Sequence, residues 1–360
     1  MSLVLTRIQN TLAKSNMDKF EYRASRYGAL NAFMVQSSDP TGILTPDLKE
    51  KAKTSIGTTL ETPVIDYDKD ITIGNERTLT IQDSENTSRF VQITFATYAW
   101  GFTIAPAMYM NNEIGIQKDF DTKMMKYIYK FAQKLDEAAL ATLAANKTQV
   151  IKNGLLYDKV GNVINAKWSE RENVFGDLEV MMGANDFYGQ LHIVGDPGVE
   201  SIMRKLQQHG LYNDVNKQNE FGTKVVHLTN NLAATPGKYA QGYAVSAGAL
   251  GMLTRFERDC LLGTVSGDGH EWGIATLPLL NMPVGTYFYD SVGDYSGIAG
   301  EATADMKRTR KEHYGFAVDV AFITAYNSDP ETLPSPIMAF NVSSEDATYA
   351  KPVFVVNQQQ

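Results

Sequence analysis

One stretch decides how the rest of the chain is organised: residues 117–146, with the sequence QKDFDTKMMKYIYKFAQKLDEAALATLAAN. Five apolar side chains recur there at three- and four-residue steps and fall on one helical face, namely Phe120, Met124, Ile128, Phe131 and Leu135. Lysines occupy the flanks, and neither proline nor glycine interrupts the run. The spacing predicts a helix about 40 Å long, well above the mean length of roughly a dozen residues. By itself, such a helix also suits the core of any α/β or α+β protein.

The composition narrows the class of protein. The 360 residues are enough for two or three lobes, each with its own core. The net charge of −8 disfavours a general nucleic-acid binder, because an acidic surface does not attract a phosphate backbone. A single cysteine, Cys260, excludes an internal disulfide framework and fits a reducing compartment. Neither a signal peptide nor an apolar run long enough to cross a bilayer is recognisable, so we expect a protein kept in a cytoplasm-like setting.

Residues 1–60 are predicted to form an N-terminal arm rather than a domain. A short amphipathic helix is expected around Ile8, followed by a mixed segment over 19–35. A second short helix is predicted over Pro46–Lys53, with Thr45 as its N-cap and proline in the first helical position. The apolar residues are too scattered to close a core. The arm is therefore expected to lie on its own body or on a neighbouring subunit.

Residues 61–116 are predicted to form an extended β-hairpin. One strand is expected over 71–81 and the other over 91–95, where apolar and polar residues alternate. An isolated hairpin is marginal in water, so a projecting ribbon predicts support from another subunit. Packing on its own domain as part of a larger sheet is the equally open alternative. The predicted tip, a candidate inter-subunit contact, consists of Gln82, Asp83, Ser84, Glu85, Asn86, Thr87 and Ser88.

The rest of the chain mixes helices and strands without a regular βαβ alternation, which predicts the α+β class. Helices are expected at 170–188, 199–208 and 249–259, and turns at 159–161 and 195–198. Strands are expected at 191–194, 224–229, 242–245, 277–289, 317–326, 337–342 and 352–356.

Motifs that carry chemistry are weak throughout the sequence. No phosphate-binding P-loop occurs, and the glycine-rich segment 263–273 is one residue off the dinucleotide fingerprint, which favours an ordinary surface loop. Within that segment, Asp268, His270 and Glu271 form a candidate metal or acid/base set, with an exposed polar loop as the favoured alternative. We therefore expect no catalytic residue, metal or cofactor.

One strong basic patch lies near the C-terminal third, formed by Lys307, Arg308, Arg310 and Lys311. It is a candidate contact for nucleic acid or for an acidic face of another subunit. Asp305 and Glu312 flank it, so a salt-bridged strand edge is an equally good interpretation.

The order of these parts resembles the HK97-type major capsid protein of tailed phages, over nearly the whole chain. The segment RFVQITFATYAWGFTIAPAM before the long helix resembles the junction between hairpin and spine helix in that family. LHIVGDPGVESIMRKLQQ and KVVHLTNNL resemble its axial domain, and KRTRKEHYGFAVDVAFITAYNSDPETLPSPIMAFNV resembles its closing strands. None of these pieces is a specific motif, and the resemblance lies in their order.

The resemblance implies an HK97-like fold with five parts. These are an N-terminal arm (1–60), an extended hairpin loop (61–116), a peripheral domain (117–169) with its spine helix at 117–146, an axial domain (170–276), and a return to the peripheral domain and C-terminal strands (277–360). The inner face of the spine is expected to lie against strands of the same subunit. Its lysine-rich side is expected to face the shell interior or a neighbour.

The implied function is a phage shell subunit that forms hexamers and pentamers of an icosahedral head around DNA. The expected partners are other copies of the chain, a separate scaffolding protein, a portal and decoration proteins, with no membrane and no sequence-specific DNA contact. The expected location is the virion, assembled in the bacterial cytoplasm. Two alternatives stay open: an encapsulin-like nanocompartment, which shares the fold, and an enzyme using Asp268, His270 and Glu271.

Overall fold

The computed structural model divides the chain into two compact units. The first contains Met1–Ser25, Phe95–Leu135 and Thr254–Ala321, and the second contains Arg26–Thr94, Asp136–Leu253 and Phe322–Gln360. The structure describes residues 3–12, 26–39, 42–54, 57–64, 89–109, 112–151, 155–210, 224–263, 269–278, 280–293, 309–327, 331 and 333–344. Helices and strands are mixed without a regular βαβ alternation along the chain, which confirms the predicted α+β class.

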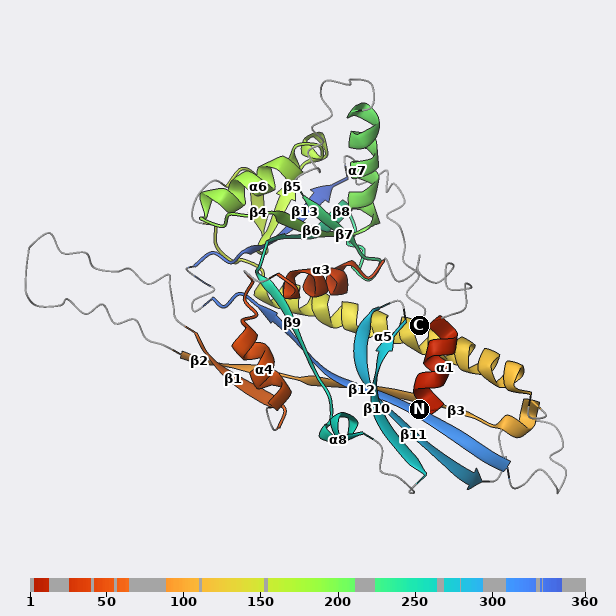
Figure 1. Ribbon diagram of the computed structural model, residues 1–360. Helices are drawn as coiled ribbons and strands as arrows, with labels where there is room; N and C mark the ends of the chain where they lie inside the picture. The colour runs from red at the N-terminus through yellow and green to blue at the C-terminus, as the bar shows by residue number, and fades with distance from the viewer. Residues whose placement is uncertain are drawn as a thin grey trace, which may run out of the picture. The chain divides into compact units, whose positions relative to one another are not determined.

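The long helix α5 spans Glu113–Asn146 and is easily followed in Figure 1. It begins four residues before the predicted start at Gln117. The reason is a cap that the apolar spacing does not reveal: Asn112 Oδ1 accepts hydrogen bonds from the backbone N–H groups of Ile114 and Gly115. The helix contributes its residues up to Leu135 to the first unit and the remainder to the second.

The first unit is built on an antiparallel sheet in the order β10–β11–β12–β3. These strands span His270–Leu277, Met282–Gly293, Thr309–Thr324 and Ala96–Ile104, and β9 (Leu250–Arg255) also pairs with β12. Along β12 the even-numbered residues from Glu312 to Val320 are buried and the odd-numbered ones are partly exposed. This period of two gives the sheet one core face. The helices α1 (Leu3–Leu12) and α8 (Arg258–Leu262) and the 3₁₀ turn η2 (Pro106–Tyr109) complete the unit.

The second unit is built on a mixed sheet in the order β4–β5–β13–β8–β6–β7. The strands span Asp158–Val160, Val163–Ala166, Ile337–Ser343, Lys238–Ser246, Leu191–Gly195 and Val225–Leu228. Ile193 packs in a cluster with α6 (Val174–Ala184) and α7 (Pro197–Gly210), whereas Val194 packs with α3 (Gly28–Ser37) and the end of α5. Because neighbouring strand residues point to opposite faces, helices cover both faces of this sheet. The 3₁₀ turn η3 (Trp168–Glu170) precedes α6.

A small separate sheet of two antiparallel strands also belongs to the second unit: β1 (Thr59–Val64) and β2 (Arg89–Thr94). These strands are the described base of the predicted hairpin. The predicted strand at 71–81 lies outside the described residues, as does the strand expected at 352–356. Helix α4 (Pro46–Thr54) confirms the predicted short helix, and its cap is the expected one, with Leu48 N donating to Thr45 Oγ1 at 3.3 Å.

Several predicted elements were wrong in type or extent. The segment predicted as a helix at 249–259 contains β9 followed by the short α8, because Leu250–Arg255 pairs with β12 and tertiary pairing overrides helix propensity. Segment 277–289 is not one strand but the end of β10, a turn and the start of β11. The helix predicted at 170–188 is confined to α6, and the strand at 242–245 is the middle of the longer β8.

Two predicted turns also differ from the structure. The segment predicted as a turn at 195–198 holds the end of β6 and the start of α7, because Asp196 Oδ1 accepts from Val199 N at 3.0 Å and Pro197 takes the first helical position. A Cβ at Gly198 would lie 2.0 Å from the Tyr239 carbonyl, so only glycine fits there. The hairpin between β4 and β5 turns at Gly161 and Asn162, which both have positive φ, one residue later than expected.

Candidate functional site

The five residues predicted for the inner face of α5 (Phe120, Met124, Ile128, Phe131 and Leu135) are at most 5% exposed. Phe120 packs edge-on against Phe102 of β3, with ring centroids 5.3 Å apart, and Phe131 lies 6.4 Å from the Trp100 ring. Lys123 Nζ also donates to the carbonyl of Thr103 at 2.9 Å. This face of the helix therefore lies against β3, in a layer of aromatic rings.

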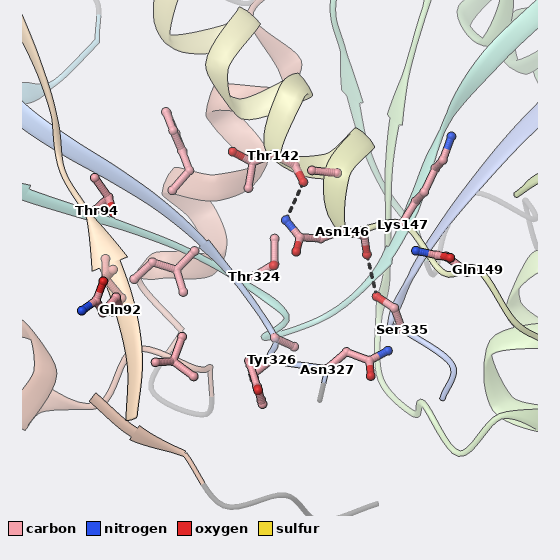
Figure 2. A pocket seen from close by; sticks show the side chains of 16 residues that line it. Gln92, Thr94, Thr142, Asn146, Lys147, Gln149, Thr324, Tyr326, Asn327 and Ser335 are labelled. Carbon is pink, nitrogen blue, oxygen red and sulfur yellow. Dashed lines mark hydrogen bonds between the residues drawn. The ribbon is translucent and has the colours of Figure 1, made fainter. Parts of the chain in front are cut away.

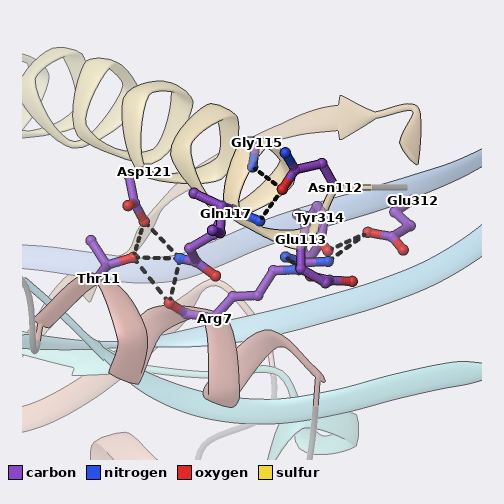
Figure 3. A network of polar contacts seen from close by, with 10 residues as sticks. Arg7, Thr11, Asn112, Glu113, Gly115, Gln117, Asp121, Glu312 and Tyr314 are labelled. Atoms are coloured by element: carbon purple, nitrogen blue, oxygen red, sulfur yellow. Dashed lines mark hydrogen bonds and ion pairs between the residues drawn. The ribbon is translucent and has the colours of Figure 1, made fainter. Parts of the chain in front are cut away.

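A network of polar contacts fixes α1 to the N-terminal part of α5 (Figure 3). Gln117 Nε2 donates to the carbonyl of Arg7 at 3.1 Å and to Asp121 Oδ1 at 2.7 Å. Thr11 Oγ1 donates to the same carboxylate oxygen at 2.7 Å. Val4 and Ile8 beside these groups are 1% and 3% exposed, so α1 is held by both apolar and polar contacts.

At the centre of this network is a buried ion pair between α1 and β12. Arg7 Nη2 lies 3.3 Å from Glu312 Oε2, and both side chains are 7% exposed. Tyr314 OH donates to the same oxygen at 2.7 Å, and burial together with this carboxylate raises the pKa of Tyr314. The other guanidinium nitrogen, Nη1, lies 3.6 Å from Glu113, whose side chain is 78% exposed. Loss of either buried partner would leave an uncompensated charge in the core.

In the second unit, the fully buried carboxylate of Asp136 on α5 holds α3 in place. Its Oδ1 accepts from Leu30 N at 2.9 Å, in the first turn of α3. Its Oδ2 accepts from Thr229 Oγ1 at 2.5 Å and from Asn231 Nδ2 at 2.8 Å. Desolvation outweighs these hydrogen bonds and raises the pKa of Asp136. The segment predicted as part of a mixed arm at 19–35 therefore includes a core helix, in which Leu30 and Phe33 are completely buried.

Among the residues whose burial is described at the base of the hairpin, Phe90 is a large apolar side chain that is exposed. Phe90 on β2 is 74% exposed and pairs with Pro63 of β1. The predicted tip residues Gln82, Asp83, Ser84, Glu85, Asn86, Thr87 and Ser88 lie outside the described residues. A single exposed apolar side chain is ordinary on a protein surface, so Phe90 acquires a role only if another surface covers it.

A cavity of about 380 Å³ lies beside β2 (Figure 2). It is bordered by β2, the end of α5, the end of β12 and the segment before β13. Ser335 Oγ donates to the Asn146 carbonyl at 2.9 Å, and Asn146 Nδ2 donates to the Thr142 carbonyl at 2.8 Å. Among the described lining residues, only Lys147 is charged. The cavity offers amide and hydroxyl hydrogen bonds rather than an acid/base pair.

The predicted basic patch is only partly within the described residues. Lys307 and Arg308 lie outside them, whereas Arg310 and Lys311 lie on β12. Arg310 Nη2 forms an ion pair with Asp290 Oδ2 on β11 at 2.9 Å. The neighbouring Glu312 points inward to Arg7 instead of pairing along the strand edge.

Of the set Asp268, His270 and Glu271, the two described residues do not lie in a loop as predicted. His270 and Glu271 are the first residues of β10, while Asp268 lies outside the described residues. His270 Nδ1 is 2.8 Å from Tyr287 OH, and its ring stacks near Trp272 and Tyr289. Adjacent strand residues point to opposite faces, so His270 and Glu271 do not converge on one ligand. Within the described ranges, no group of three metal-ligating side chains comes together.

The sequence did not reveal a buried histidine pair in the second unit. His192 Nδ1 and His227 Nε2 lie 3.1 Å apart on β6 and β7, and the two residues are 5% and 8% exposed. Burial and the neighbouring His192 lower the pKa of His227 to about 4. Burial acts in the opposite sense on Asp196 and raises its pKa to about 6. Two histidines on predicted strands were visible in the sequence, but nothing in it indicated that these strands pair.

Comparisons with known proteins gave structural likenesses alone. No family model and no curated protein sequence matches the chain. "The capsid of Myoviridae Phage XM1" is 14% identical, with 86% of this chain and 92% of that chain covered and a TM-score of 0.44. A structure from Mycobacterium phage Che8 is 9% identical, with 82% and 88% covered and a TM-score of 0.44. "Capsid structure of the Cyanophage P-SCSP1u" is 10% identical, with 81% and 84% covered and a TM-score of 0.43. Likenesses at these TM-scores do not decide the function of this chain.

Within the part of the chain that the structure describes, none of the helices is both long and apolar enough to span a lipid bilayer.

Proposed function

We propose that this chain is the major capsid protein of a tailed bacteriophage, which assembles into hexamers and pentamers of an icosahedral head around DNA. The observation that carries the proposal is the hairpin base. Among the described residues, β1 and β2 form a sheet of two strands only, and β2 exposes Phe90. One face of this ribbon is covered within the subunit, since Leu60 and Ile93 are 7% and 6% exposed, and contact with a neighbouring copy would cover the opposite face, which presents Phe90.

The position of the hairpin in the chain supports the same proposal. One residue, Phe95, separates β2 from β3, and β3 leads through a single 3₁₀ turn, η2, into α5. The helix is fixed to β3 by aromatic packing and to α1 by the Arg7 network. Because the hairpin is joined through so short a connection to this packed region, a contact made by the hairpin can be transmitted along the chain to the core of its own subunit. Obligate contacts of this kind typically bury more than about 2,000 Å².

We assign the units to shell parts on this basis. The first unit, with its sheet, α1 and the first part of α5, corresponds to the peripheral domain, and its helix is the spine. The six-stranded sheet of the second unit corresponds to the axial domain, and β1 and β2 to the stalk of the extended loop. The chain has a structural rather than a catalytic role in this assignment.

The partners follow from the same proposal. Other copies of the chain are the main partners, with a separate scaffolding protein, a portal and decoration proteins completing the head. DNA lies inside the shell without sequence-specific contacts. The shell is assembled in the bacterial cytoplasm and becomes the virion capsid.

Negative-stain electron microscopy of the purified chain, expressed alone and with a candidate scaffold, tests this function. Closed shells, rings or flat sheets of a single repeating subunit are the expected result. A protein that stays monomeric in sedimentation velocity at all concentrations, with and without scaffold, and forms no particles on the grid would contradict the proposal.

A further inference from the structure

The solvent-facing side of α5 in the first unit carries a stripe of lysines, defined here as Lys118, Lys126 and Lys130. All three side chains are exposed. They recur at eight- and four-residue steps, so they follow the helix on the side opposite Phe120 and Ile128. At 1.5 Å per residue the stripe is about 18 Å long.

The charge of this stripe is not compensated within the described residues. None of the three lysines lies within ion-pair distance of a described carboxylate. The two aspartates in the same turns are engaged elsewhere: Asp119 pairs with Lys123 at 2.7 Å, and Asp121 accepts from Thr11 and Gln117. Lys126 and Lys130 are separated by one helical turn, and like charges at that spacing destabilise a helix. The arrangement costs stability in the isolated subunit, and an anionic ligand would relieve that cost.

We infer that the lysine stripe binds the phosphate backbone of duplex DNA without reading its sequence. Flexible lysines that present point charges along one side of a helix suit phosphates, which carry no sequence information. Lysine is depleted in protein–protein interfaces, which makes another copy of this chain the poorer match. Of the two tyrosines on this part of the helix, Tyr127 is stacked on Trp100 with ring centroids 5.6 Å apart, and Tyr129 has its hydroxyl oxygen buried, so neither is an open platform for an unpaired base.

The expected contact is weak in one subunit. An 18 Å length of duplex carries about ten phosphate charges, of which three lysines neutralise few, and the net charge of −8 opposes approach of the whole chain. Many copies facing one DNA molecule would add their contacts through effective concentration. This inference rests on the proposed function, since a shell subunit has packaged DNA to contact. Because binding would be weak and independent of sequence, the DNA could still be packaged into the shell and released from it.

The test uses the purified, unassembled full-length chain and a fluorescent duplex of about 20 base pairs. Anisotropy is measured across a salt series. If the three lysines neutralise three phosphates, the logarithm of the association constant should fall with the logarithm of the salt concentration at a slope of about −2.7. The association constant then falls about 40-fold between 50 and 200 mM salt. The variant Lys118→Gln/Lys126→Gln/Lys130→Gln should bind at least about tenfold more weakly at low salt, with a slope near zero. The control variant Lys51→Gln/Lys53→Gln/Lys167→Gln removes three exposed lysines of the second unit and the same charge, and it should bind as the unaltered chain does.

Three outcomes would overturn the inference: no binding of DNA by the unaltered chain at low salt, unchanged binding by the stripe variant, or an equal loss in the control. If the stripe variant instead loses association between copies while DNA binding is unchanged, the stripe is a contact between subunits and the inference is wrong. Microscopy of the same proteins separates the two proposals. Shells without stripe-dependent DNA binding leave the proposed function standing, whereas stripe-dependent binding without any assembly leaves only the inference standing.

Discussion

Replacement of Asp136 by alanine is expected to destabilise the second unit by about 4 kcal/mol. The carboxylate is completely buried and accepts three hydrogen bonds, from Leu30 N, Thr229 Oγ1 and Asn231 Nδ2. Alanine provides no acceptor, so three donors lose their partner in a region with no room for bulk water. The first turn of α3 loses its cap at the same time.

The magnitude follows from these contacts. Each buried donor left unsatisfied costs about 1–3 kcal/mol, and loss of a helix cap costs about 1 kcal/mol. Burying the carboxylate destabilises the native protein, as its raised pKa indicates. The alanine variant no longer has this penalty, so its net loss of stability is smaller than the sum of the lost contacts. Asp136→Asn keeps one oxygen for Leu30 N, and the Thr229 hydroxyl can rotate to accept from the new amide. That variant should lose about 1–2 kcal/mol.

Urea unfolding followed by circular dichroism measures both variants, and hydrogen exchange of residues 28–37 locates the effect on α3. Glu137→Ala changes the next carboxylate of the same helix, which is partly exposed, and should cost about 0.5 kcal/mol or less. A loss below about 1 kcal/mol for Asp136→Ala, or equal losses for the alanine and asparagine variants, would refute the role assigned to this carboxylate.

Three further predictions concern the first unit, the histidine pair and the hairpin. Arg7→Ala leaves Glu312 buried without its counter-charge and should lower the free energy of unfolding by about 3–5 kcal/mol, measured by heat or urea. Glu113→Ala removes an exposed partner of the same arginine and should lower it by less than about 1 kcal/mol. Similar losses of stability in both variants would contradict the assignment of a stabilising buried pair. Because the pKa of His227 is depressed in the folded chain, only the unfolded chain takes up a proton at this residue between pH 6.5 and about 4. His227 therefore lowers the stability of the fold as the pH falls through that window. The raised pKa of Asp196 has the opposite effect on stability. His227→Gln removes the titrating histidine, so the stability that this variant loses relative to the unaltered chain should be about 2–3 kcal/mol smaller at pH 4.5 than at pH 7 in urea unfolding. A loss of stability that does not change with pH would contradict the depressed pKa of His227. Deletion of 82–88 should leave a chain with native circular dichroism that no longer assembles, and shells of normal size from this deletion would show that the hairpin tip does not join subunits.

Local signals in the sequence determined the elements whose stabilising contacts lie close together in the chain. The three- and four-residue spacing from Phe120 to Leu135 predicted α5, and Thr45 with Pro46 predicted the start of α4. The apolar runs at 191–194 and 337–342 predicted β6 and β13, the strands that pair with β8 on either side in the six-stranded sheet. For α5, β6 and α4, propensity and periodicity agree with the environment that the fold provides.

Tertiary structure decided the elements for which local preference and environment disagree. Leu250–Arg255 contains good helix formers, but pairing with β12 makes it a strand. Helix α3 has buried residues on most of its circumference, so its sequence lacks the polar face that would have marked it as a helix. His270 and Glu271 followed glycines and suggested a loop, yet the partner strand β11 extends β10 to include them.

The polar residues of the candidate sites differ in the same way: some could be placed from the sequence and others only from the tertiary structure. The sequence by itself determined that α5 has a lysine-rich side, because the helical period alone places Lys126 and Lys130 away from the apolar face. Only the tertiary structure brought Arg7 to Glu312, 305 residues away in the chain, and Asp136 to Leu30, 106 residues away. A periodic pattern reports the environment of one element, whereas an ion pair or a cap between distant segments depends on how those elements pack. No local pattern encodes that packing.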